Sequence, residues 1–240
     1  MPCGRSTGPP SRNDAAGPRF EPISKPDGGL RWLTRLDPAG EAEYRDTVRP
    51  LASRIERALG PEVFAVRTRP VAGGWSLAPW RPARAAWQRT LRRLICDVTR
   101  ETTFAVADVH DCYGSISPET IAALLGPGAA HAVDFLRRVH DRGVRGLPIG
   151  PAPSAVLANA VLSEMDRVIR GTGARHVRWV DDVFLWGSGA EVRHALRALD
   201  DVAAGMGLAL HPEKTRVLAD RHEARAVALG ARDSSIIAAP

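Results

Sequence analysis

Residues 175–187 read RHVRWVDDVFLWG and place two adjacent aspartates inside a run that otherwise alternates like two short apolar strands. A carboxylate is costly to bury without a partner, and a strand interior disfavours aspartate by propensity. In one continuous strand, Asp181 and Asp182 would point to opposite faces, whereas at the tip of a tight hairpin both can approach the same side. The stretch therefore predicts a β-hairpin with a carboxylate pair at its turn.

Adjacent carboxylates raise each other's pKa unless a cation lies between them, and hard oxygen ligands of this kind suit Mg²⁺ or Mn²⁺. A third carboxylate, Asp108, ends the apolar strand-like run TFAVADV at residues 103–109. Three carboxylates on neighbouring strand ends could hold two metal ions roughly 3.5–4 Å apart, as in-line phosphoryl transfer requires. An Asp–Asp pair alone is a weak signal, since most such pairs are solvated turns.

The bulk composition indicates a soluble protein that buries a sizeable core. Of 240 residues, 44% are hydrophobic and 25% are charged, which is ordinary for a globular chain. The sequence contains no apolar run of membrane-spanning length and no signal-peptide segment at its start. Its three cysteines lack metal-ligand spacing and suit a reducing compartment. We expect a cytoplasmic protein with no membrane partner.

The positive charge is concentrated in the first half of the chain. Residues 1–107 carry a net charge of +7 and residues 108–240 a net charge of −1, which predicts one surface that meets a polyanion. An arginine-rich composition from a GC-rich genome would produce the same bias. Only two of the 33 basic residues are lysines, Lys25 and Lys214, so these positions suggest sites that need a compact ammonium.

A helix expected over residues 82–98 carries several of these arginines, with two tryptophans nearby. Arginine interleaved with tryptophan suits contact with phosphates and bases. A solvated basic face above tryptophans that belong to the core is an equally open interpretation. The residues concerned are Arg84, Arg89, Arg92, Arg93, Trp80 and Trp87.

The remaining pattern predicts an irregular alternation of strands and helices, which favours an α+β fold with helices on one face of a sheet. Residues 24–29 form a turn before a strand at 30–36, so the ordered chain opens on a hairpin. Further strands are expected at 63–69 and 215–219, and helices at 41–59 (interrupted or kinked at Pro50), 118–125, 129–141, 154–170 and 190–205.

Several segments resemble, in order, the motifs of reverse transcriptases. These are ISKPDGGLRWL, FAVADVHDCYGSI, GLPIGPAPSAVLANAVLSEMD, RWVDDVFLW, LHPEKT and ALG, and together they cover about residues 21–230. The sequence is most similar to the bacterial branch, alongside retron-type, intron-encoded and abortive-infection or other phage-defence enzymes. The resemblance implies an α+β right-hand polymerase fold of fingers and palm, with an antiparallel palm sheet backed by helices.

The resemblance also implies a division of the chain. Residues 1–20 would be a disordered tail, 21–107 the fingers region, 108–232 the palm with the catalytic motifs, and 233–240 a short tail. A helical thumb, which normally follows and holds the template–primer duplex, would be absent. A protein partner or an associated RNA would then supply the missing duplex-binding surface.

Carried over residue by residue, the resemblance makes Asp108, Asp181 and Asp182 the ligands of two Mg²⁺ (or Mn²⁺) ions, with the Val109 carbonyl as a further ligand. Lys214 would donate a proton to the leaving pyrophosphate, a role that arginine fills poorly.

Other positions would bind the incoming nucleotide. Lys25 and Arg31 would grip the triphosphate, and Tyr113 would lie under the sugar and select deoxynucleotides by excluding a 2′-hydroxyl. The loop and helix that follow contribute Pro148, Gly150, Ser154 and Asn159. Structural alternatives are a packed core aromatic for Tyr113, a turn for the loop, a helix N-cap for Ser154 and a buried amide for Asn159.

Two substitutions depart from the family pattern. Ile149 replaces the usual glutamine of the Pro–Gln–Gly loop, and Trp179 replaces the usual tyrosine before the aspartate pair. The leading hypothesis is an RNA-directed DNA polymerase whose partners are an RNA template, a DNA or RNA primer and dNTPs. The alternatives are a catalytically impaired nucleic-acid-binding relic or subunit, and untemplated or protein-primed DNA synthesis in phage defence.

Overall fold

A computed structural model describes residues 17–24, 28–99 and 101–230. The helices and strands are, in chain order, β1 (Arg19–Ser24), β2 (Leu30–Arg35), α1 (Pro38–Ala58), β3 (Thr68–Val71), β4 (Gly74–Leu77), α2 (Trp80–Asp97), β5 (Thr103–Ala107), α3 (Cys112–Ser115), α4 (Pro118–Leu125), the 3₁₀ helix η1 (Gly126–Ala129), α5 (Ala130–His140), α6 (Ala152–Gly171), β6 (Arg175–Trp179), β7 (Asp182–Gly187), α7 (Gly189–Gly205), β8 (Arg216–Leu218) and α8 (Arg221–Gly230).

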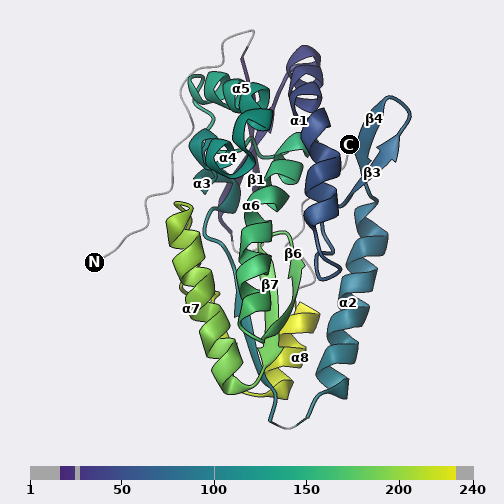
Figure 1. Cartoon of the computed structure of the whole chain (residues 1–240), viewed down its shortest axis with the longest axis vertical. Helices are drawn as coiled ribbons and strands as arrows, with labels where there is room; N and C mark the ends of the chain where they lie inside the picture. The colour runs from purple at the N-terminus through teal and green to yellow at the C-terminus, as the bar shows by residue number, and fades with distance from the viewer. Residues whose placement is uncertain (1–16, 25–27, 100, 231–240) are drawn as a thin grey trace.

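A four-stranded antiparallel sheet in the order β6-β7-β5-β8 forms the centre of the lower half in Figure 1. Side chains alternate between its two faces, as in any strand. One face presents residues such as Ala105 and Leu185 to helices α6 and α7. The other presents larger side chains, including Phe104, Phe184 and Trp186, to α2 and α8.

Both faces of this sheet are therefore covered, whereas the sequence pattern predicted helices on one face only. The physical reason lies in the strands themselves, because TFAVA and VFLW are apolar at consecutive positions. A strand that is apolar on both sides needs cover on both sides. In Figure 1, α7 and α2 flank the sheet on opposite sides, while α6 crosses in front of it.

The upper half combines the two hairpins β1–β2 and β3–β4 with helices α1, α4 and α5. Helix α1 is continuous through Pro50, contrary to the expected interruption. Pro50 lies on the exposed side of the helix, where water can satisfy the carbonyl that proline leaves without a donor. Inside, the ring of Tyr44 stacks on Phe135 with a centroid distance of 4.5 Å, which joins α1 to α5.

The strand expected at residues 63–69 is wrong, since strand geometry begins only at Thr68. The preceding segment instead crosses the edge of the sheet beside β6. There the Phe64 N–H donates to the Arg178 carbonyl at 3.1 Å, and the Arg178 N–H donates to the Glu62 carbonyl at 2.9 Å. Val66 then turns with a positive φ of 57°.

Two strands lie at the borders of the predicted segments. Strand β1 begins at Arg19, inside the segment expected to be a disordered tail at 1–20. Strand β5 was expected in the fingers region at 21–107, yet it is a central strand of the sheet that carries the paired aspartates. Residues 1–16 and 231–240 lie outside the described part of the chain. No helix among the described residues is both long and apolar enough to cross a membrane.

Candidate active site

The register of the sheet brings charged residues together at one end. Asp182 opens β7 opposite Trp179, the last residue of β6. Ala107 pairs with Val183, so one further step along the ladder places Asp108 opposite Asp182. Val106 pairs with Arg216 on β8, so two further steps bring Lys214 next to Asp108. The Lys214 Nζ donates to Asp108 Oδ2 at 3.0 Å.

The turn between β6 and β7 holds the remaining aspartate and confirms the predicted hairpin. Val180 and Asp181 form this two-residue turn, and Val180 has a positive φ of 54°. A β-branched residue in that region costs about 1–3 kcal/mol and persists only where its surroundings hold it. Here the buried Arg178 donates from Nη1 to the Val180 carbonyl at 2.8 Å.

Burial and the negative charges of neighbouring carboxylates raise the pKa values of Asp181 and Asp182. Burial, followed by the charge of Asp108, raises the pKa of Asp181 to about 6. Burial, followed by the charges of Asp181 and Asp108, raises the pKa of Asp182 to about 7. The positive charge of Lys214 opposes both shifts without cancelling them. Hard carboxylate oxygens that carry excess negative charge are the donor set a divalent cation such as Mg²⁺ requires.

The backbone around Asp108 is fixed by the segment that carries Lys214. The Asp108 carbonyl accepts from the His211 N–H at 2.7 Å, and the His110 N–H donates to the Ala209 carbonyl at 2.8 Å. Burial lowers the pKa of Lys214, but its hydrogen bond to Asp108 and the charges of the three aspartates outweigh burial and raise it overall. Lys214 is therefore an ammonium at neutral pH, with half of its side chain exposed.

Tyr113 and Arg31 border this cluster. Tyr113 lies in α3, where burial first, and then the charges of Cys112 and Asp181, raise the pKa of its hydroxyl, while Arg31 lowers it. Arg31 lies on β2 and also lowers the pKa of Asp181. Both predicted nucleotide-site residues thus interact electrostatically with Asp181. Lys25, predicted to act with Arg31, lies outside the described residues.

The loop before α6 is clamped between α3 and β2. The Leu147 N–H donates to the Tyr113 carbonyl at 2.8 Å, and the Thr34 N–H donates to the Ile149 carbonyl at 2.7 Å. Gly146 has a φ of 63°, and a Cβ at this position would lie 2.3 Å from the Tyr113 carbonyl oxygen. Only glycine allows this approach. The clamp fixes Pro148, which is buried and follows Leu147, and Gly150, which is exposed and lies beside Thr34 of β2.

Ser154 and Asn159 point into the protein interior. The Ser154 hydroxyl shares a hydrogen bond of 3.0 Å with the Tyr44 hydroxyl, and Pro151, not Ser154, is the N-cap of α6. The Asn159 amide donates to the Val66 carbonyl at 3.1 Å. Their side-chain polar groups therefore make internal bonds, which agrees with the buried-amide alternative for Asn159 and contradicts the N-cap alternative for Ser154.

A buried ionic network behind the turn was missed by the sequence analysis. Arg178, which is completely buried, bonds through Nε and Nη2 to both oxygens of Asp166 at 2.8–3.1 Å and through Nη1 to Asn159 Oδ1 at 2.9 Å. Burial acts to raise the pKa of Asp166, but the charge and hydrogen bonds of Arg178, together with a hydrogen bond to His176, lower it to about 2. The network thus connects α6 to β6, the strand that leads into the turn at Val180 and Asp181.

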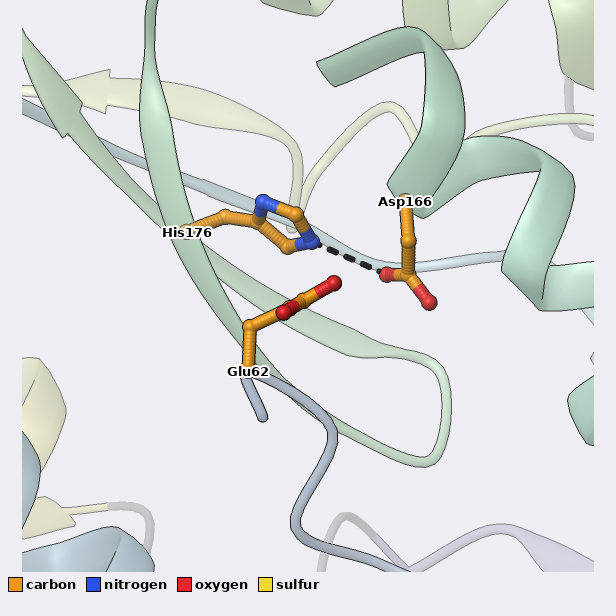
Figure 2. Close-up of side chains that lie close together, drawn as sticks. All are labelled: Glu62, Asp166 and His176. Carbon is orange, nitrogen blue, oxygen red and sulfur yellow. Dashed lines mark hydrogen bonds and ion pairs between the residues drawn. The ribbon is translucent and has the colours of Figure 1, made fainter. Parts of the chain in front are cut away.

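Figure 2 shows the outer part of this network, in which His176 and Asp166 hydrogen-bond at 3.0 Å beside Glu62. The three side chains offer ligand atoms close enough to hold a metal ion. Arg178 already neutralises Asp166, however, and Arg170 pairs with Glu62. We therefore interpret the group as a structural ion-pair network. Its sequence signal is the placement of His176 and Arg178 two positions apart, and so on one face, in a strand that also contains Val177 and Trp179.

Arg84 does not lie on the basic face expected for residues 82–98. It is buried, and its guanidinium stacks over Trp87 at 4.6 Å and over Trp179 at 5.0 Å, measured to the ring centroids. Its charge lowers the pKa of Asp182. The basic face expected for residues 82–98 therefore lacks Arg84. The indole at position 179, where the family pattern has tyrosine, provides one of the two aromatic surfaces that hold this cation.

Comparison with known proteins relates this architecture to polymerases. The family model described as reverse transcriptase (RNA-dependent DNA polymerase) matches residues 69–230. No curated protein sequence matches the chain.

Several solved structures have similar folds. One is apo telomerase from Candida tropicalis truncated from its C-terminal domain, with 12% identity, a TM-score of 0.51, and coverage of 85% of this chain and 50% of that one. Telomerase from the same organism with a TWJ fragment of telomeric RNA has 10% identity, a TM-score of 0.55 and coverage of 87% and 42%. A structure titled RdRp complex has 10% identity, a TM-score of 0.52 and coverage of 85% and 20%. The chain thus spans half or less of the length of these proteins, and the likeness is one of fold.

Proposed function

The chain belongs to the reverse transcriptase family and has its fingers-and-palm fold, and from this premise we propose that it is an RNA-directed DNA polymerase that adds dNTPs to a primer 3′-hydroxyl. The observation that carries the proposal is the convergence of Asp108, Asp181 and Asp182 with Lys214 at one end of the sheet. Carboxylates from separate strands with raised pKa values are typical of sites built for cation-assisted chemistry.

The donor set fits a pair of hard divalent cations. Asp108, Asp181 and Asp182, with the Val109 carbonyl, would hold two Mg²⁺ or Mn²⁺ ions. When bound, such ions favour ionisation of an attacking hydroxyl and stabilise negative charge on a leaving oxyanion. The excess negative charge of these donors supports this assignment, since Lys214 offsets it only in part.

The remaining residues would orient the nucleotide and manage the proton. Arg31 supplies a charged donor for the triphosphate, with Lys25 as its expected companion. Tyr113, clamped by the loop from Gly146 onwards, would lie under the sugar ring. Lys214 is positively charged and half exposed, so its Nζ can deliver a proton to the departing pyrophosphate.

The test is primer extension on an RNA template annealed to a DNA primer, with each dNTP and rNTP offered separately in Mg²⁺ and then in Mn²⁺. We expect dNTP incorporation that follows the template and is lost in the double variant Asp181→Asn, Asp182→Asn. A matched control exists on α7, where Asp200→Asn and Asp201→Asn remove the same two charges from an exposed surface. This control should retain activity.

Two results would contradict the proposal. Absence of extension by the wild-type protein, with the fold intact by circular dichroism, would favour a nucleic-acid-binding protein without polymerase activity. Incorporation whose sequence ignores the template would instead favour untemplated synthesis, which the replacement of glutamine by Ile149 first suggested.

A further inference from the structure

The outer surface of α2 and α8 carries a basic face that the catalytic machinery does not use. Helix α2 buries a stripe that includes Trp87, Leu91 and Ile95 against the sheet. Its opposite side exposes four arginines, and α8 packs beside it with three further exposed basic side chains. These seven residues, called here the α2–α8 basic face, are Arg81, Arg89, Arg92, Arg93, Arg221, His222 and Arg225.

The two helices border an open cavity within this face. Its volume is about 450 Å³, and it is lined by Ile95, Cys96, Arg221, His222 and Arg225, with no acidic side chain among them. Arg221 donates to the Thr99 carbonyl at 3.3 Å, which fixes the start of α8 against the end of α2. The cavity is therefore a concave, cationic site rather than a gap between independent helices.

Among the described residues, four arginines of this face have no carboxylate partner that would neutralise them. Arginines elsewhere pair with neighbouring acids, as in Arg35–Glu21, Arg137–Glu119 and Arg138–Glu43. Within the described part of the chain, no ion pair joins a carboxylate to Arg89, Arg92, Arg93 or Arg225. Like charges held at helical spacing repel one another until an anion neutralises them.

The location of the face relates it to the active site. Helix α2 covers the sheet face on which Trp179 lies, and near its start Arg84 stacks on Trp179 next to the catalytic turn. From Arg84 to its end at Asp97 the helix extends about 20 Å at 1.5 Å per residue. Phosphates follow one another every ~3.4 Å along a strand, so this length matches roughly six nucleotide steps.

We propose that the α2–α8 basic face binds the phosphate backbone of the template–primer duplex as it leaves the active site, with the cavity near Arg221 receiving a phosphate group. This inference rests on the proposed polymerase function. In this proposal the arginines of the α2–α8 basic face contact the duplex, because a planar guanidinium group can bind two phosphate oxygens at once.

The experiment is equilibrium binding of a fluorescently labelled 12-bp RNA–DNA duplex to the full chain in EDTA, measured by anisotropy between 50 and 300 mM KCl. The test variant is Arg89→Gln, Arg93→Gln, and the matched control is Arg193→Gln, Arg197→Gln. The control removes the same charge at the same helical spacing from α7, on the other side of the sheet. Thermal melts of all proteins establish that they fold equally well.

We expect the test variant to bind the duplex at least tenfold more weakly at low salt, and the slope of log K against log[salt] to shrink by about 2, since each phosphate contact contributes about 0.9. The control should change affinity less than twofold. A 4-bp duplex should bind the wild type weakly, because it is too short to span the face.

Equal losses in both variants would attribute binding to net charge and overturn the proposal, as would unchanged binding by the test variant. Tighter binding of single-stranded RNA than of duplex, lost in the same variant, would overturn the duplex assignment. Because the assay needs no catalysis, an inactive wild-type protein that binds as described would refute the proposed function while still assigning duplex binding to the α2–α8 basic face.

Discussion

Replacing Asp182 by asparagine should stabilise the protein when no metal ion is present. In the folded chain, burial and the neighbouring charges of Asp181 and Asp108 raise the pKa of Asp182 from 3.8 to about 7. In the unfolded chain the same carboxyl ionises near its ordinary pKa of about 3.9. Unfolding therefore releases a proton between these two pH values, so the wild-type free energy of unfolding falls as pH rises from about 4 to about 7. Asparagine removes this penalty.

The magnitude follows from the size of the pKa shift. A difference of about three pKa units at about 1.36 kcal/mol each sets an upper limit of ~4 kcal/mol. Asp181 titrates in the same cluster, so the raised pKa values belong to the pair and only part of this limit is due to Asp182. We expect a gain of about 2–4 kcal/mol at pH 8, or about 5–15 °C in Tm, that shrinks to a few tenths of a kcal/mol near pH 4.

The assay is urea unfolding in EDTA at half-unit steps from pH 4.5 to 8.5, with Asp201→Asn on the exposed surface of α7 as the control. The gain should grow with pH and level off above about 7. Saturating Mg²⁺ should reduce it, because a cation that binds the folded wild type adds its own stabilisation. A variant no more stable than wild type at pH 8, or a gain independent of pH, would refute the electrostatic argument.

Three further changes test other parts of the structure. Arg178→Met should cost about 3–5 kcal/mol in urea unfolding, because it leaves Asp166 buried without its cation, and wild-type stability would contradict that role. Gly146→Ala should lower the urea midpoint, since its Cβ would lie 2.3 Å from the Tyr113 carbonyl oxygen, and an unchanged midpoint would show that the clamp yields easily. Calorimetric Mg²⁺ affinity should fall up to roughly tenfold per pH unit between about pH 7 and pH 6 and more steeply below pH 6, because the hairpin aspartates with their raised pKa values bind first one proton and then two. A pH-independent affinity would place the cation elsewhere.

The local pattern of the sequence predicted the elements that position the site. The apolar alternation around the aspartate pair predicted the β6–β7 hairpin, and the helix predicted at 118–125 agrees with α4, which Ser117 caps. These features depend on residues a few positions apart, so strand alternation and helix capping are visible in the chain itself. The order of the sequence motifs likewise predicted the reverse transcriptase family.

Polar side chains inside apolar elements could not be assigned from the sequence. Helix α6 is buried on nearly all sides, so its periodicity does not tell whether Ser154 and Asn159 face a ligand or the core. Arg84 and Arg178 look like surface arginines by composition. Their burial depends on Trp179 and Asp166, which contact them only in the folded chain.

The sequence by itself therefore determined the fold class, the hairpin and the identity of the acidic residues, because short-range periodicity and motif order carry that information. Only the tertiary structure decided that Lys214, 106 positions away, donates to Asp108, and that the hairpin aspartates have raised pKa values. The physical reason is that burial and Coulomb interactions depend on distances in space. Those distances are set when the registers of β5, β7 and β8 place separate segments side by side.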